Sequence, residues 1–428
     1  MSLLIAIALA GSMNQDLKGQ ALLDDLSRRA VNYFWERSHP STHFTKDRSA
    51  NFQEQDRPEN RVSSIAAIGY ALSAYAIGAE RGWLPKEEAL DRARNTLKNV
   101  RAKAPQHRGW YYHFFDWETG ERIWNCELSS IDTAILLANM LIAERGFKDP
   151  EFSRLSDDIL QRVDWKWMLT DGSALPDSKT FAHGWKPDEG FLKNRWAEYC
   201  EHMMLYIVGM GASDDVSDST WTAWRRPIIR YKDYETLLGG PLFIHQMSHG
   251  MIDFKNRRDV LGYDYWVASY QQTHAQRAYC MDNPQGFKGY GPDIWGLSAC
   301  DVPDGYRACG APGWIDDDGT LAPAAAVASA MFDRELAVRA AEAFLRDYPN
   351  SYGRYGFTTG LNPTKAWQSP DVIGIDLGQL LLCLEVARDG LPHRWSMSHP
   401  VIQRGMSKAG FRLTDEGPSE RRSLRKTS

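Results

Sequence analysis

The feature that most constrains the fold of this chain is a recurring apolar segment that is rich in small residues and carries almost no charge. A helix on the surface of a globular protein keeps one polar face, whereas a helix that is apolar nearly all round is buried on every side. The sequence therefore predicts buried helices in six places, which are residues 62–79, 128–143, 201–212, 235–250, 320–332 and 375–387.

Helices of a second kind separate these segments, and in them charged and apolar residues alternate with the helical period. They are predicted at residues 22–37, 85–103, 151–163, 258–279 and 332–348. Six buried helices that alternate with about six half-exposed ones predict an all-α double ring, the (α/α)6 toroid. A closed ring needs all its helices at once and no Pro-, Gly- or Ser-rich linker divides the chain, so we expect one domain over residues 16–412.

Both ends of the chain are expected to lie outside this domain. Residues 1–15 contain an apolar stretch that ends in Ala8-x-Ala10, which resembles a signal cleavage site, although no Lys or Arg precedes it. We interpret it either as the remnant of an export signal, which predicts a periplasmic or secreted protein, or as a start-site artefact or tag on a cytoplasmic one. The polar residues 413–428 are expected to form a disordered tail.

Composition excludes several classes of function. The net charge of -5 and the pI near 6.1 argue against a nucleic acid partner, which requires a basic surface. The sequence contains no apolar run of the roughly 18 residues that a membrane span needs. The cysteines show no CxxC spacing, and only Cys300 and Cys309 are placed to form a disulfide, with free thiols as the alternative.

Acidic residues gather at or just before the starts of the predicted buried helices. Because the inner helices of a toroid run parallel, their N-terminal ends should meet at one mouth and bring these acids together. Glycosidic bond cleavage needs two carboxyl groups in different environments, one protonated to release the leaving oxygen and one ionised to activate water. The catalytic candidates are Glu127, Asp132 and Glu201, and the acids predicted to bind substrate are Asp293, Asp304, Asp317 and Asp376.

A structural interpretation competes with the catalytic one for each of these acids. Ser129-x-x-Asp132 fits a helix capping box, in which the two side chains satisfy N–H groups of the first helical turn. Capping does not account for Glu127 or for the apolar character of the helix that follows. Asp132 is therefore expected to face a cavity, with or without a capping role.

Long loops rich in aromatic residues and glycine interrupt the helices. Loops of this length inside a compact domain are usually functional, and flat aromatic rings offer apolar contact to sugar rings. The tryptophans predicted to be sugar platforms are Trp110, Trp124, Trp295, Trp314 and Trp367.

His245, His249 and Asp253 follow one another at i+4 steps, which would be a possible metal-binding face. No HExxH motif accompanies them, so we interpret His249 as a residue of the cleft wall that hydrogen-bonds substrate, and we expect neither metal nor cofactor. The sequence contains no Walker loop, GxSxG elbow or GxGxxG after a strand, which disfavours nucleotide-dependent enzymes and serine hydrolases.

Five stretches of the chain resemble the bacterial glycoamylase-like family, which includes endo-β-1,2-glucanases and relatives of the C-terminal domain of cyclic β-1,2-glucan synthase. They read "EHMMLYIVGMG", "FIHQMSHGMIDF", "GYGPDIWGLSACDVPDGY", "DDDGTLAP" and "DVIGIDLGQLLLCLE". The resemblance covers about residues 20–412 and implies a toroid that hydrolyses glycosides, with inversion. It also implies that Glu201 is the general acid, although Tyr199 and Cys200 stand where the family has a Trp-Asn pair.

We therefore expect a glycoside hydrolase whose substrate is a bacterial β-glucan, most simply β-1,2-glucan. Two alternatives stay open at this point. One is another toroid enzyme, such as an α-glucan hydrolase of the glucoamylase type or a lyase. The other is a glycan-binding protein that has kept the aromatic cleft and lost catalysis.

Overall fold

The structure is a computed structural model that describes residues 17–415, apart from 54 and 59, together with residues 423–425. The candidate export signal at residues 1–15 and most of the polar tail lie outside the described residues. Within them, no helix combines the length and the apolarity that crossing a lipid bilayer would require.

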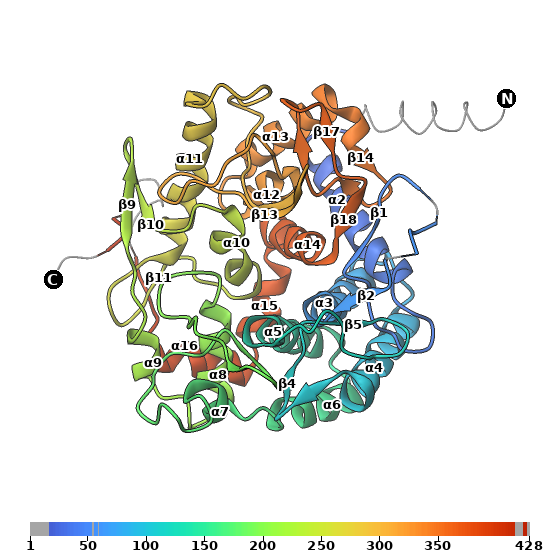
Figure 1. Cartoon of the computed structure of the whole chain (residues 1–428), viewed down its shortest axis with the longest axis vertical. Coiled ribbons are helices and arrows are strands. Elements are labelled where there is room, and N and C mark those ends of the chain that lie inside the picture. Colours follow the sequence, from blue (N-terminus) through green and yellow to red (C-terminus); the bar gives the residue numbers. More distant parts are fainter. Residues whose placement is uncertain (1–16, 54, 59, 416–422, 426–428) are drawn as a thin grey trace.

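Six helices form the closed inner ring that the sequence predicts (Figure 1). Each contacts the next one in chain order, and the last contacts the first. They are α3 (Ile65–Glu80), α5 (Ser130–Phe147), α8 (Met203–Ala212), α10 (Leu242–Met251), α12 (Pro323–Ala328) and α14 (Gly374–Asp389). The predicted segments differ from the helices mainly at their ends. Residues 62–64, 128–129 and 235–237 belong to strands, and the helix predicted to end at residue 332 continues after α12 as the 3-10 helix η1 (Ser329–Met331).

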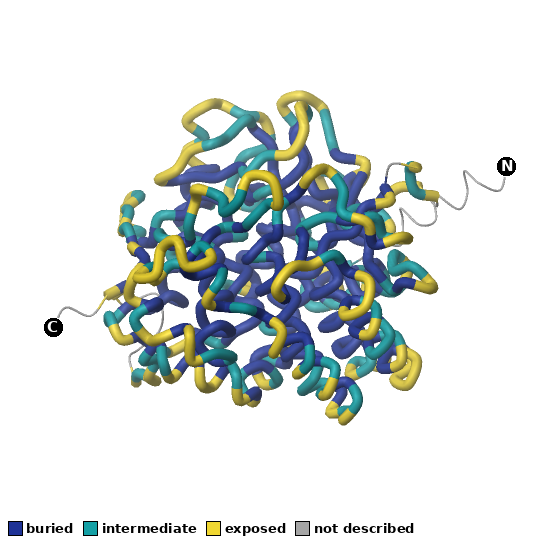
Figure 2. Tube along the Cα trace, turned by 60° about the horizontal axis from the view of Figure 1, so that its bottom comes forward, coloured by how far each residue is buried: buried dark blue, intermediate teal, exposed yellow. Residues whose placement is uncertain are grey.

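A second set of helices packs around this ring and leaves its charged residues in solvent. Five of them match the predicted amphipathic segments, and the sixth, α16, was not predicted. They are α2 (Gly19–Glu36), α4 (Lys86–Lys103), α6 (Pro150–Gln161), α11 (Tyr265–Asp282), α13 (Arg334–Asp347) and α16 (Pro400–Lys408). Figure 2 shows the buried segments in the middle of the molecule and the exposed ones around it.

Short elements complete the architecture. Helix α15 (Leu391–Met397) contacts three inner helices, α5, α10 and α14. The remaining short helices are α7 (Trp165–Leu169), α9 (Ser219–Thr222) and η2 (Pro349–Ser351).

The strands are short and antiparallel, and most form two-stranded ribbons. The chain also forms a hairpin around residues 118–120, where Phe115 forms an antiparallel β-bridge with Arg122. The pairs are β1 (Arg48–Ala50) with β18 (Asp371–Ile373), β2 (Val62–Ser64) with β5 (Phe114–Asp116), β3 (Gln106–His107) with β4 (Trp110–Tyr111), β9 (Ile228–Tyr231) with β10 (Tyr234–Leu237), β11 (Arg257–Arg258) with β19 (Arg412–Leu413), β12 (Ala299–Val302) with β13 (Gly305–Ala308), β14 (Tyr352–Gly353) with β15 (Gly356–Phe357), and β16 (Leu361–Asn362) with β17 (Trp367–Gln368). The one larger sheet orders β6 (Leu128–Ser129), β7 (Gly184–Lys186) and β8 (Gly190–Phe191).

Glycines let neighbouring helices approach each other closely, both within the inner ring and between the inner and outer rings. A Cβ atom on Gly69 of α3 would lie 2.6 Å from the Cα atom of Leu136 on α5. A Cβ atom on Gly405 of α16 would lie 2.0 Å from the carbonyl oxygen of Ile207 on α8. Real Cβ atoms cannot come so near to backbone, so the spacing of these helix pairs depends on the absence of side chains.

The tail is partly ordered, contrary to the expectation of disorder. Leu424 is buried, and its carbonyl oxygen accepts a hydrogen bond from the backbone N–H of Asp264 at 2.9 Å. The guanidinium of Arg425 lies over the ring of Tyr263. The polar composition of residues 413–428 hid this docking, because a single apolar residue supplies the buried contact.

Cys300 and Cys309 are free thiols, both fully buried and in hydrogen-bond contact with each other beside the β12–β13 hairpin. Of the two alternatives left open by the sequence, the structure has the unbridged one.

Replacing Gly69 by Ala tests whether this packing limits stability. Helix propensity alone would make the variant more stable by up to about 1 kcal/mol. Because the new methyl group would collide with the backbone of α5, we expect a loss of about 1–3 kcal/mol in the free energy of unfolding. Urea titration measures the difference. Gly291→Ala is the matched control, since a Cβ atom there meets nothing within 4 Å. A Gly69→Ala variant as stable as the control would contradict the packing argument.

Candidate active site

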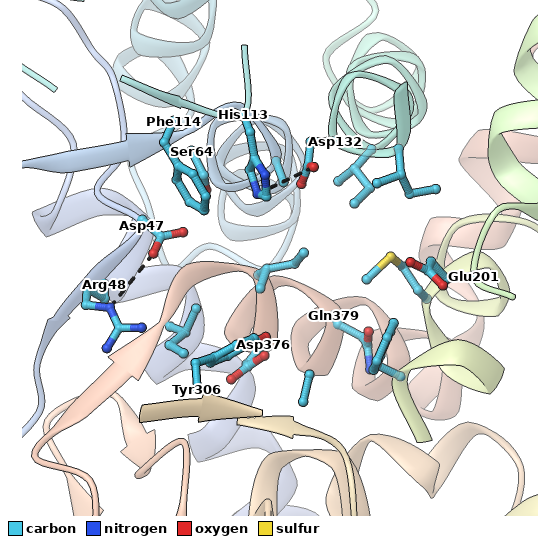
Figure 3. A pocket seen from close by; sticks show the side chains of 18 of the residues that line it. Asp47, Arg48, Ser64, His113, Phe114, Asp132, Glu201, Tyr306, Asp376 and Gln379 are labelled. Carbon is cyan, nitrogen blue, oxygen red and sulfur yellow. Dashed lines mark ion pairs between the residues drawn. The ribbon is translucent and has the colours of Figure 1, made fainter. Parts of the chain in front are cut away.

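Residues at the N-terminal ends of the inner helices line a cavity of about 510 Å³ (Figure 3). Five of the six inner helices contribute to it, through Ser64 before α3, Asp132 in α5, Glu201 before α8, Phe243 in α10 and Asp376 in α14. The predicted convergence of helix starts on one mouth is therefore confirmed. Sites for small ligands have volumes of roughly 300–1,000 Å³ and combine apolar walls with a few polar groups, and this cavity fits that description.

Glu201 reaches this cavity from a buried position two residues before α8, with only 9% of its surface exposed. Burial raises the pKa of its carboxyl group and the charge of Asp132 adds to the increase, whereas a hydrogen bond from the Cys200 thiol opposes it. The backbone at this point is held by Ser248, whose hydroxyl donates to the carbonyl oxygen of Glu201. Glu201 is therefore a fixed acid that keeps its proton to a higher pH than an ordinary glutamate.

Asp132 lies on another wall of the cavity, in the first turn of α5. The hydroxyl oxygen of Ser129 accepts a hydrogen bond from the backbone N–H of Asp132 at 3.2 Å, and the same hydroxyl donates to its carboxylate. The carboxylate also lies 3.5 Å from Nε2 of His113. Asp132 consequently caps its helix and lines the cavity at the same time.

His113 lies between two acids in the loop before β5. Its Nδ1 is 2.9 Å from Oε1 of Glu127, and its ring stacks on Phe114 with centroids 3.7 Å apart. Burial alone would lower the pKa of His113, but the charges of Asp132, Glu127 and Asp47 together raise it to about 9. In return, the hydrogen bond from His113 lowers the pKa of Glu127 although burial acts in the opposite direction.

The side of the cavity away from Glu201 holds a second group of charged side chains, Asp47, Arg48 and Asp376 (Figure 3). Burial raises the pKa of Asp376 to about 7, and the charges of Asp301 and Asp47 contribute, although the hydroxyl of Thr359 donates a 2.7 Å hydrogen bond to its carboxylate. Arg48 lies 3.2 Å from Asp301 and 3.9 Å from Asp47. This side of the cavity is therefore polar and able to hydrogen-bond a hydroxylated ligand.

The arrangement supplies what general acid–base chemistry requires. Burial raises the pKa of Glu201, while the carboxylate of Asp132 lies 3.5 Å from Nε2 of His113. An acid and a base in one cavity, differentiated by their surroundings, can protonate a leaving group and activate a water molecule.

Comparison with known proteins relates the chain to a family. Residues 193–400 match the family model Glycoamylase, which is described as "Putative glucoamylase". A curated relative from Parabacteroides distasonis is 26% identical over 91% of this chain. Residues 193–400 of the chain therefore resemble the glycoamylase-like family. That relative is named an exo β-1,2-glucooligosaccharide sophorohydrolase (non-reducing end), and the match covers 58% of its length.

Solved structures agree with the fold. A protein from Bacteroides fragilis, whose structure is described in the same words as the family model, superposes with a TM-score of 0.82 at 27% identity, covering 92% of this chain and 97% of its own. An endo-β-1,2-glucanase from Chitinophaga pinensis, solved with sophorotriose and glucose, superposes with a TM-score of 0.84 at 24% identity, covering 92% of this chain and 98% of its own. The chain therefore has the (α/α)6 toroid fold.

The structure brings together only part of the predicted site. Asp132, Glu201, Trp124 and Asp376 line the cavity. Glu127 was predicted to be catalytic, but it does not line the cavity. It contacts the cavity residue His113 instead, so it lies behind the cavity wall.

Three predicted binding residues are in the core. Trp110 is fully buried against Trp165, and its indole N–H donates to the carbonyl oxygen of Asp164. Trp295 is fully buried in the second hydrophobic cluster. His249 is fully buried as well, with Nε2 3.0 Å from the hydroxyl of Ser269. These positions exclude contact with a ligand in the cavity, because packed neighbours surround each side chain.

The other predicted binding residues lie outside the cavity. Asp304 is in the exposed turn between β12 and β13, Asp293 pairs with Arg339, and Asp317 accepts a hydrogen bond from the hydroxyl of Tyr290. Trp314 is half exposed in a loop, and Trp367 is half buried in β17. Within the described residues, no group of three or more His, Cys, Asp or Glu side chains is arranged to hold a metal ion.

Five residues that line the cavity were not predicted from the sequence, namely Asp47, Arg48, His113, Tyr306 and Gln379. A signal existed for Gln379, which follows Asp376 by three residues and is therefore on the same face of an otherwise apolar helix. The other four come from loops and ribbons, where spacing carries no such information.

Trp110 and Trp124 belong to one loop but should respond differently to truncation. Trp110→Ala would leave a large cavity in the core, and we expect it to lose about 3–5 kcal/mol in the free energy of unfolding. Trp124 is 69% exposed, and Trp124→Ala should stay within about 0.5 kcal/mol of the parent. Equal losses for the two variants in urea titration would contradict the assignment of Trp110 to the core and Trp124 to the rim.

Proposed function

We propose that this protein is a glycoside hydrolase that cleaves β-1,2-linked glucan with inversion at the anomeric carbon, with Glu201 as the general acid and Asp132 as the general base. The observation that carries the proposal is the differentiation of two carboxyl groups in one cavity. Glu201 is buried and its pKa is raised, while Asp132 lies 3.5 Å from the cation His113.

The reaction follows from these two environments. Glu201 donates its proton to the glycosidic oxygen as that bond breaks, and Asp132 accepts a proton from a water molecule whose oxygen bonds to the anomeric carbon. The polar side of the cavity, with Arg48 and Asp376, would hydrogen-bond sugar hydroxyls. The exposed rim residues Trp124 and Tyr306 would offer aromatic faces to the sugar rings.

The linkage is supported by the relative from Parabacteroides distasonis, whose name specifies β-1,2-gluco-oligosaccharides. A panel of β-1,2-glucan, β-1,3-glucan and soluble starch tests it through the release of reducing ends. Cleavage of β-1,2-glucan is expected, with the α-anomer as the first product seen by proton NMR. Starch as the preferred substrate would replace the proposal with an α-glucan hydrolase, and binding without cleavage would replace it with a glycan-binding protein.

Replacing Glu201 by Gln keeps the size and hydrogen bonding of the side chain and removes its transferable proton. Turnover of the cleaved glucan should fall by about 10²–10⁴-fold, which is the usual contribution of acid–base catalysis, while affinity and melting temperature stay close to those of the parent. Glu198→Gln is the matched control, because Glu198 pairs with Arg225 away from the cavity. Near-normal turnover of Glu201→Gln would rule out Glu201 as the acid.

We also propose that the protein acts in the periplasm, supported by the apolar stretch and the Ala8-x-Ala10 pattern near its N-terminus. Fractionation of the native host, followed by immunodetection, should find the protein with periplasmic markers. Detection only in the cytosolic fraction would refute export.

A further inference from the structure

One imidazole ring bridges two carboxyl groups beside the cavity. Nδ1 of His113 lies 2.9 Å from Oε1 of Glu127, and Nε2 lies 3.5 Å from Oδ2 of Asp132. An ionised carboxylate can only accept hydrogen bonds, and both ring nitrogens carry protons only in the imidazolium form. With a carboxyl group on each side of the ring, the geometry favours the charged form of His113.

The wider surroundings of His113 favour the same form. The charged groups that face it come from three elements: Asp132 from α5, Glu127 from the segment before β6, and Asp47 from the segment before β1. All three are acids. Lys186 on β7 lowers the pKa of Glu127, and burial lowers the pKa of His183 although the charge of Glu127 opposes this. The ring also stacks on Phe114, which shields one face from water.

We propose that His113 is a positioning residue: an imidazolium, held by Glu127, that orients Asp132 as the acceptor of the proton from the attacking water. The inference rests on the proposed function. It gives Glu127 a role one step removed from the substrate, as the counter-ion that fixes the charge and the orientation of His113.

The proton balance of the reaction is complete without a transfer to the imidazolium. The water molecule loses one proton to Asp132 while its oxygen bonds to the anomeric carbon, and the glycosidic oxygen leaves with the proton of Glu201. His113 already carries protons on both nitrogens, so it has no lone pair with which to accept another. Its contribution is electrostatic and geometric, which separates it from a histidine that acts as a base.

The kinetic test compares kcat and KM of His113→Gln with those of the parent at neutral pH. Without the ring that orients Asp132, kcat should fall by about 10–100-fold, because a misplaced catalytic group slows the reaction, whereas KM should change little. A kcat close to that of the parent, or a loss that appears only in KM, would overturn the inference. His107→Gln is the matched control, because His107 is exposed and stacks on Trp185 outside the cavity.

A second measurement does not depend on activity. NMR of the full chain with labelled histidine should show one imidazole, identified by its loss in His113→Gln, that keeps both protons up to a pH of about 9. Glu127→Gln should lower the pH at which that ring loses its proton. A neutral His113 at pH 7 would overturn the inference even in an active enzyme. If the imidazolium is present but no glucan is cleaved, the proposed function fails and the charge state of His113 stands.

Discussion

The rest of the structure depends on one constraint, which is that helices without a polar face must be covered on every side. Six such helices cover one another on their inner sides by closing a ring, and the outer helices cover the rest. The ring is tight where glycine lets two backbones approach, as Gly69 does between α3 and α5. Parallel helices in a closed ring bring their N-terminal ends to one place. The positive ends of several helix dipoles therefore surround the same cavity, and acidic side chains are the groups that such a site favours.

The acids in this cavity do not behave alike, because their nearest neighbours differ. Glu201 is buried beside a thiol and feels the charge of another acid, which favours its proton. Asp132 is as deeply placed but has an imidazolium beside it. Two carboxyl groups of similar chemistry thus have different surroundings, which are set by residues that neither motif nor spacing would single out.

Sequence patterns predicted the parts that depend on local periodicity and failed where distant segments decide. All six inner helices were predicted, since an apolar helix is recognisable from its own residues. Glu201, Asp132 and Asp376 were found because helix starts are recognisable too. Trp110 and Trp124 could not be told apart, since what buries Trp110 is Trp165, more than fifty residues away in the chain. Glu127 was predicted to be an acid of the cleft because its contact with His113, 14 residues earlier in the chain, does not show in the spacing of charges.

The way the outer ring is filled has a consequence for the order of synthesis. Helix α8 begins two residues after Glu201, yet the helix that covers its outer face is α16, which follows almost two hundred residues later. During synthesis on the ribosome, α3 and α5 can pack against each other early. One apolar face of α8, however, stays in contact with water until residue 408 has left the ribosome. The helix that follows Glu201 is thus among the last parts of the chain to be covered, and until then it is open to proteases.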